Sequence, residues 1–182
     1  FIRATFHEPR HEFPYEIVIE PKMSFGTGHH QTTKLMLEWL LGMDVQGKTV
    51  LDMGCGTAIL GILAAKLGAL AIDAIDYDEV CYISAKENAA LNKVSLTAFC
   101  GSKEVIPNKK YDILLANINR NILLDQIERY SEVIQNSGVL LLSGFYEDDL
   151  EILIQKAEKH NFKYDAFTKL DNWVSAKFIY KP

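Results

Sequence analysis

Apolar and polar positions follow two different periods along this chain, and they predict strands and helices in turn. Short apolar runs bounded by glycine, proline or asparagine are typical of buried strands, whereas apolar residues spaced three and four apart are typical of amphipathic helices. Helix ends are expected at Gly42, Gly68 and Asn92. The predicted strands are 15–20, 49–52, 71–76, 96–100, 112–116, 138–143, 162–170 and 173–180, and the predicted helices are 33–41, 59–67, 78–91, 122–134 and 147–160.

The order of these segments predicts the fold class. Strands that alternate with helices at this spacing are typical of a doubly wound α/β domain with a mostly parallel sheet. The last two strands are separated only by the turn residues Asp171 and Asn172, so they are expected to form an antiparallel hairpin. In a fold of this class the ligand lies beyond the carboxyl ends of the strands.

Composition narrows the class of protein. The chain has 182 residues, 48% of them hydrophobic and 24% charged, which is typical of an ordinary soluble domain with one core. A net charge of −5 argues against direct nucleic-acid binding and suits a basic protein partner better. Cys55, Cys81 and Cys100 suggest neither a disulfide framework nor a zinc site, which indicates a reducing compartment. No signal peptide and no membrane span are expected.

A glycine turn between a strand and a helix is the first candidate site. Asp52 ends the strand, and Gly54 and Gly56 follow it. A dinucleotide fingerprint would place a third glycine where this chain has Ile59, and no glycine is followed by the Lys-Ser/Thr pair of a phosphate-binding loop. An acid at the helix mouth disfavours a pyrophosphate and favours a cationic cofactor such as S-adenosylmethionine (SAM). The alternative, that the glycines only permit a tight turn, stays open.

A second acid follows the next strand. Asp76 stands 22 residues after Gly54, close to the spacing at which a carboxylate binds the two hydroxyls of a ribose. Asp78 immediately precedes a helix, so we expect it to cap that helix. Asp73 is expected to be solvated or at an edge.

The loop before the first helix is rich in glycine, histidine and threonine. We expect it to fold over the cofactor, with Phe25 as an apolar wall and Thr33 offering its hydroxyl to the methionine portion. The alternative is that Thr32 caps the helix while Gly26 and Gly28 permit the turn.

The fourth predicted strand of the sheet ends in an amide. Asn117 is the candidate catalytic residue, because its oxygen could accept a hydrogen bond from a nucleophilic amine and orient it toward a methyl group. The alternative role for Asn117 is to start a turn. Asn119 is ambiguous, and Arg120 is expected to face solvent.

One motif imitates a zinc protease. His7, Glu8 and His11 form H-E-x-x-H, but Pro9 lies inside the helical turn that zinc binding would require. We therefore expect a polar loop between strands and no metal.

Five segments along the chain carry a resemblance to a known family. They are Phe25-Gly-Thr-Gly with Thr32-Thr33, Val50-Leu-Asp-Met-Gly-Cys-Gly, Ile75-Asp76-Tyr-Asp, Ala116-Asn117-Ile and Leu142-Ser143-Gly144. In these segments the chain resembles the catalytic domain of the PrmA family, which methylates ribosomal protein eleven of the large subunit, and the similarity covers about residues 10–180. The glycine turn and Asp76 alone would indicate only the class I SAM-dependent superfamily.

The resemblance implies a seven-stranded class I methyltransferase domain in which Thr33, Gly54, Asp76 and Asn117 bind SAM. It also implies a bacterial, cytoplasmic enzyme that trimethylates amino groups, including lysine side chains and an N-terminus. Asn117 is followed by Ile-Asn-Arg rather than Pro-Pro-Tyr, which disfavours the related enzymes that methylate planar amides or bases.

Some features depart from the family pattern. His29, Gln31 and Ala58 replace the commoner Thr, Pro and Gly. The family carries a small N-terminal domain that recognises the ribosomal protein, and this chain, which begins at Phe1, is expected to be a fragment without it. Residues 1–20 are then a linker and a leading strand, and residues 21–182 the methyltransferase domain.

The sequence therefore predicts a SAM-dependent protein N-methyltransferase acting on a ribosomal protein. Two alternatives stay open: a methyltransferase for another protein, an RNA or a small molecule, and a non-catalytic SAM-binding module. Asn117 is the expected catalytic residue, and the expected cofactor-binding residues are Phe25, Thr33, Asp52, Gly54, Gly56, Asp76 and Asn117.

Overall fold

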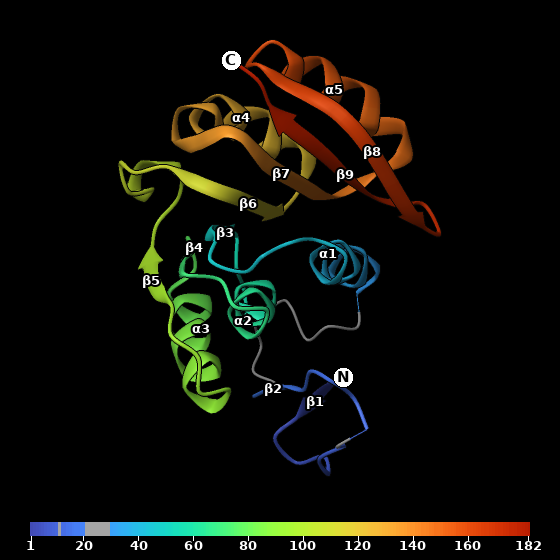
Figure 1. Ribbon diagram of the computed structural model, residues 1–182. Helices are drawn as coiled ribbons and strands as arrows, with labels where there is room; N and C mark the ends of the chain where they lie inside the picture. Colours follow the sequence, from blue (N-terminus) through green and yellow to red (C-terminus); the bar gives the residue numbers. More distant parts are fainter. Residues whose placement is uncertain (11, 21–29) are drawn as a thin grey trace.

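The computed structural model describes residues 1–10, 12–20 and 30–182, and strands alternate with helices as the sequence predicts (Figure 1). The strands are β1 (Ile2–Ala4), β2 (Ile17–Ile19), β3 (Thr49–Met53), β4 (Ala71–Asp76), β5 (Thr97–Cys100), β6 (Tyr111–Asn117), β7 (Ile134–Tyr146), β8 (Phe162–Leu170) and β9 (Trp173–Tyr180). The helices are α1 (Gln31–Leu41), α2 (Ile59–Lys66), α3 (Glu79–Leu91), α4 (Arg120–Val133) and α5 (Leu150–Glu158), with short 3-10 turns η1 (Lys103–Val105) and η2 (Glu147–Asp149).

The main sheet has seven strands in the order β5-β4-β3-β6-β7-β9-β8. Strands β3 to β7 run parallel, whereas β9 is antiparallel to both of its neighbours, β7 and β8. The strand order reverses beside β3, so the carboxyl ends of β3 and β6 form the switch point of a doubly wound fold. The predicted fold class and the C-terminal antiparallel hairpin are confirmed.

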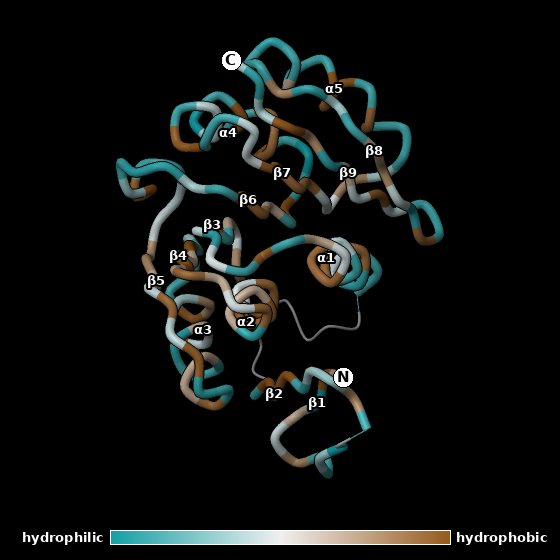
Figure 2. Tube along the Cα trace, in the orientation of Figure 1, coloured by the Kyte–Doolittle hydropathy of each residue, from teal (hydrophilic) through white to brown (hydrophobic). Residues whose placement is uncertain are grey.

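Helices cover both faces of this sheet (Figure 1), and the strand residues alternate between two cores. Leu114 and Ala116 of β6 pack with α4 and α5, whereas Ile113 and Leu115 pack with α1 and α2. In Figure 2 the apolar colour concentrates on the central strands, which are buried on both faces. Burial on both faces explains why these strands are nearly continuous apolar runs.

Local capping sets several helix boundaries. Asp78 caps α3, as predicted, by accepting a hydrogen bond from the Val80 amide at 2.8 Å. The cap of α1 is His30 rather than Thr32, because the imidazole accepts from the Thr32 amide and Thr32 itself lies inside the helix. Asn119 caps α4, which therefore begins at Arg120, two residues earlier than predicted. Arg120 is exposed, as expected, and also forms an ion pair with Asp149.

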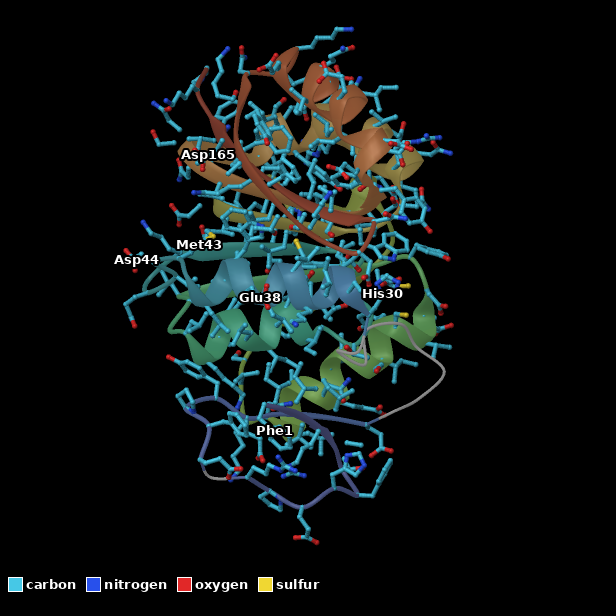
Figure 3. The ribbon with its side chains drawn as sticks, turned by 90° about the vertical axis from the view of Figure 1, so that its right-hand side faces the viewer. Phe1, His30, Glu38, Met43, Asp44 and Asp165 are labelled. Atoms are coloured by element: carbon cyan, nitrogen blue, oxygen red, sulfur yellow. The ribbon has the colours of Figure 1, made fainter. Side chains whose placement is uncertain are left out.

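The N-terminal strands form a separate two-stranded parallel sheet. Asn92 binds β2 through both of its side-chain polar atoms, which contact the amide and the carbonyl of Val18. In Figure 3, Phe1 lies at the N-terminal two-stranded sheet, while His30 and Asp44 mark opposite ends of the α1 region. The loop between β1 and β2 carries His7 outside any helix, as predicted, whereas His11 lies outside the described residues.

One expectation is wrong. Asp73 is neither solvated nor at an edge, since only 3% of it is exposed. Its carboxylate accepts a hydrogen bond from the Tyr111 hydroxyl and pairs with Lys109 at 2.7 Å. The sequence pattern of β4 did not show these partners because both come from β6 and the segment just before it.

Candidate functional site

A pocket of about 730 Å³ opens at the carboxyl ends of the parallel strands. Its lining includes Met53 from the end of β3, Asp76 from β4 and Asn117 from β6. Ser102, just after β5, and Trp173, at the start of β9, extend the lining to either side. Its position beside the switch point is where a doubly wound fold binds its ligand.

The glycine turn forms part of the pocket wall. Gly54 and Gly56 both line the pocket, and both have positive φ angles, +65° and +53°. A side chain at Gly54 would also collide with the side chain of Ile118. Ala58 adopts a φ of +59°, so this turn is left-handed at a residue that glycine would fit with less strain.

Asp76 faces the pocket and is held in place by backbone amides. One carboxylate oxygen accepts from the Gly56 amide at 2.9 Å, and the other accepts from the Asp78 amide at 3.0 Å. No cation pairs with it among the described residues. A carboxylate offers about four acceptor positions, so this fixed group keeps capacity for two further donors such as hydroxyls.

Asp52 lies below the pocket rather than in its lining. It is 1% exposed and accepts a hydrogen bond from the Gly61 amide at 3.0 Å. Burial raises the pKa of Asp52 to about 7, the Gly61 hydrogen bond opposes the rise, and the charge of Asp76 adds to it. Asp52 is not among the residues that line the pocket, so its contact with the cofactor stays a prediction.

Asn117 and Thr33 come together although they lie 84 positions apart in the chain. The Asn117 Nδ2 atom donates to the Thr33 hydroxyl at 3.5 Å, which is a long contact. The Asn117 Oδ1 atom is buried and has no hydrogen-bond partner among the described residues. A buried acceptor without a donor is costly, so this oxygen is the lining atom that gains most from a ligand N–H.

Several lining residues were missed by the sequence reasoning. His30 packs edge-on against Trp173 with ring centroids 4.8 Å apart, and Trp173 contacts Tyr146 at 4.2 Å. Trp173 begins an antiparallel strand, and its start lies beside the carboxyl ends of the parallel strands. A search for site residues only at the carboxyl ends of strands therefore misses Trp173. Ser102 and Gln126 line the β5 side. The same rule, applied to β5, would have found Ser102.

Three other predictions concern Phe25, metal binding and membrane spans. Phe25 lies outside them, so its role as an apolar wall stays a prediction. Among residues 1–10, 12–20 and 30–182, no group of three His, Cys, Asp or Glu side chains could hold a metal ion. The described helices also include none long and apolar enough to cross a membrane.

Comparison with solved structures supports the same architecture. The structure matches the crystal structure of ribosomal protein L11 methylase from Lactobacillus delbrueckii subsp. bulgaricus with a TM-score of 0.92 and 29% identity, covering 100% of this chain and 94% of that chain. A methyltransferase from Pyrococcus furiosus, at 16% identity, shares the fold with a TM-score of 0.77 over 91% of this chain and 90% of that chain. The fold is therefore that of the Rossmann-like class I methyltransferases.

The sequence comparisons identify the family. The model of the ribosomal protein L11 methyltransferase (PrmA) family matches residues 1–180, so the chain belongs to that family, as the resemblance predicts. A relative named ribosomal protein L11 methyltransferase from Porphyromonas gingivalis is 46% identical over 179 residues, which are 97% of this chain and 62% of the relative. Another with that name from Phocaeicola vulgatus is 42% identical over 182 residues, or 99% of this chain and 65% of the relative. The chain thus spans less than two thirds of these relatives.

Proposed function

We propose that this chain supplies the SAM-binding and methyl-transfer site of an enzyme that methylates amines of ribosomal protein L11, both lysine side chains and the N-terminus. The observation that carries the proposal is the pair of open acceptors in one pocket, the Asp76 carboxylate and the Asn117 Oδ1 atom. Family membership supports the substrate. The proposal includes a cytoplasmic location, where ribosomal proteins are synthesised.

The residues present fit SAM. The ribose would present two hydroxyl donors, which suit Asp76, and the amine-bearing methionine portion would meet Thr33 and Asn117 on the β6 side. Apolar side chains of Ile75 and Ile122 also line the pocket and could flank an adenine ring. When bound, SAM would supply a methyl group activated by a positively charged sulfur.

Asn117 is the residue best placed to act on the methyl acceptor. A lysine amine must be neutral to attack, and an amide oxygen accepts an N–H without the negative charge that would stabilise the unreactive ammonium form. The Asn117 Oδ1 atom would therefore hold the neutral amine and direct its lone pair. Because methyl displacement depends mainly on alignment, no dedicated general base is required among the lining residues.

Asp52 would contribute through charge rather than contact. Its ionised carboxylate would stabilise a cationic ligand above it, and such a ligand would in turn favour ionisation of Asp52. Substrate recognition is assigned to the part of the longer relatives that this chain does not span. The net charge of −5 would attract a basic ribosomal protein only through long-range, salt-sensitive steering.

The test is to incubate L11 and labelled SAM with residues 1–182 and, in parallel, with the full-length protein. We expect residues 1–182 to bind SAM with a dissociation constant on the order of micromolar but to methylate L11 poorly. The full-length protein should add methyl groups to lysine and N-terminal amines, as read by peptide mass. SAM binding without methylation of L11 by the full-length protein would contradict the proposed substrate, and absence of SAM binding would contradict the site itself.

A further inference from the structure

The β5 side of the pocket contains a chain of hydrogen bonds that is buried at one end and that the proposed function does not use. The Tyr130 hydroxyl, on α4, donates to the Gln126 Oε1 atom at 2.6 Å. The Gln126 Nε2 atom donates to the Ser102 hydroxyl oxygen at 2.9 Å. Tyr130 is fully buried, Gln126 is 3% exposed, and Gln126 and Ser102 line the pocket.

The direction of these hydrogen bonds is fixed by the buried end. Within the described chain, Gln126 Oε1 is the acceptor available to the Tyr130 hydroxyl, and a buried hydroxyl without an acceptor is costly. The Gln126 side chain must therefore turn its oxygen toward Tyr130 and its NH₂ group toward Ser102. Ser102 then receives a hydrogen bond, so its own hydroxyl hydrogen is left to donate.

No group of the described protein accepts that hydrogen. The other hydrogen bonds of Ser102 use its backbone: the amide donates to Glu104 at 2.7 Å, and the carbonyl accepts from the Val105 amide at 3.1 Å. Asp125 also lines this end of the pocket, but its carboxylate pairs with Lys103 at 2.7 Å. The Ser102 hydroxyl is thus oriented as a hydrogen-bond donor beside the pocket.

We propose that Gln126 and Tyr130 are positioning residues that orient the Ser102 hydroxyl as a donor to a ring nitrogen of the ligand. The inference rests on the proposed function, with the ribose on Asp76 of β4. Asp76 ends β4 and Ser102 follows the neighbouring strand β5, and both line the pocket, so a base that extends from that ribose toward β5 would turn its far edge toward Ser102. In adenine that edge carries N1, an acceptor, whereas in hypoxanthine N1 bears a hydrogen and opposes the donor.

The test compares binding of S-adenosylhomocysteine with S-inosylhomocysteine by calorimetry, using residues 1–182. We expect the unchanged protein to prefer the adenosyl ligand by about ten-fold or more, because the inosyl ligand sets donor against donor. Ser102→Ala should bring the preference to within about three-fold. Gln126→Glu should change the Ser102 hydroxyl from a donor to an acceptor on its pocket side. A carboxylate at position 126 accepts from both Tyr130 and Ser102, which leaves a Ser102 lone pair toward the pocket.

Two further variants keep the result interpretable. Gln135→Glu places the same change at an exposed position of β7 and should leave the preference unchanged. Tyr130→Phe removes the group that fixes Gln126 and should give an intermediate preference, which carries the test if Gln126→Glu fails to fold in a thermal melt. A preference that persists in Ser102→Ala, or that is absent from the unchanged protein, would overturn the inference alone. Failure to bind either ligand would overturn the proposed function with it.

Discussion

Two carboxylates on one strand, Asp73 and Asp76 of β4, have contrasting bonding partners. Both are nearly buried, with 3% and 7% of their surfaces exposed. Asp73 lies at the amino-terminal half of the strand, where the Tyr111 hydroxyl and the Lys109 ammonium satisfy it. Asp76 lies at the carboxyl end, where its partners among the described residues are the neutral amides of Gly56 and Asp78.

The difference separates a carboxylate that the protein itself neutralises from one that we propose binds the ligand. A buried carboxylate that pairs with a cation of the protein has little left to offer a ligand, whereas one held by amides is fixed in position and keeps its charge for a donor from outside. Burial alone therefore does not identify a site residue. The identity of the partners is more informative, and Asp52, with one amide partner in the described part of the chain, is an intermediate case.

The largest effect is expected for Asp52. Because its pKa is raised from 3.8 to about 7, the folded protein holds a proton that the unfolded chain loses near pH 4. The stability of the unchanged protein should therefore fall between about pH 4 and pH 7, by roughly 4 kcal/mol from this group. Asp52→Asn should remove that fall, so the variant should be equal to the parent near pH 4 and more stable at pH 8. Urea denaturation without ligand measures this, with the exposed Asp44→Asn as control.

Asp73→Ala should cost about 2–3 kcal/mol of stability, because it removes the partner of Tyr111 and Lys109 at a buried position. Lys109 is half exposed and regains water, which keeps the loss below that of a fully buried pair. Affinity for S-adenosylhomocysteine should change less than about two-fold. Tyr111→Phe is the matched control, with a loss of about 1 kcal/mol. A large loss of affinity in Asp73→Ala would show that the two ends of β4 are not independent.

Asp76→Ala should show the reverse pattern. Affinity for S-adenosylhomocysteine should weaken by about 1.5–3 kcal/mol through the loss of two charge-assisted hydrogen bonds. Asp78→Ala, which removes a helix cap two residues away, should instead lower the melting temperature more than the affinity. Calorimetry and thermal melts on both variants check this. Unchanged affinity in Asp76→Ala would contradict the assignment of Asp76 as the group that binds the ribose.

The smallest effect is expected at Asn117. Asn117→Ala in the full-length protein should lower turnover of L11 about ten-fold at saturating SAM, since one neutral hydrogen bond to the amine is lost. Turnover by the unchanged protein should rise from neutral to alkaline pH as the acceptor lysine loses its proton. Asn136→Ala, at an exposed position of β7, serves as the control. A flat pH profile, or full turnover in Asn117→Ala, would assign the alignment of the amine to another residue.

The order of elements and the ends of the parallel strands were open to prediction because they depend on local properties. Apolar runs, helix stops and caps are set by residues a few positions apart, so the fold class, the Asp78 cap and the hairpin at Asp171-Asn172 followed from the pattern. The placement of Asp76 and Asn117 in one pocket followed from a second local fact, that both end parallel strands.

Contacts between distant segments decided the rest. Asp73 could not be assigned from β4 because its partners depend on where β6 begins, and His30 and Trp173 meet only after an antiparallel strand has returned to the pocket. The polarity of Ser102 depends on Gln126 and Tyr130, 24 and 28 positions further along the chain, and therefore on how α4 packs beside β5. Sequence periodicity records which side of an element is buried, and only tertiary packing settles which polar groups that burial brings together.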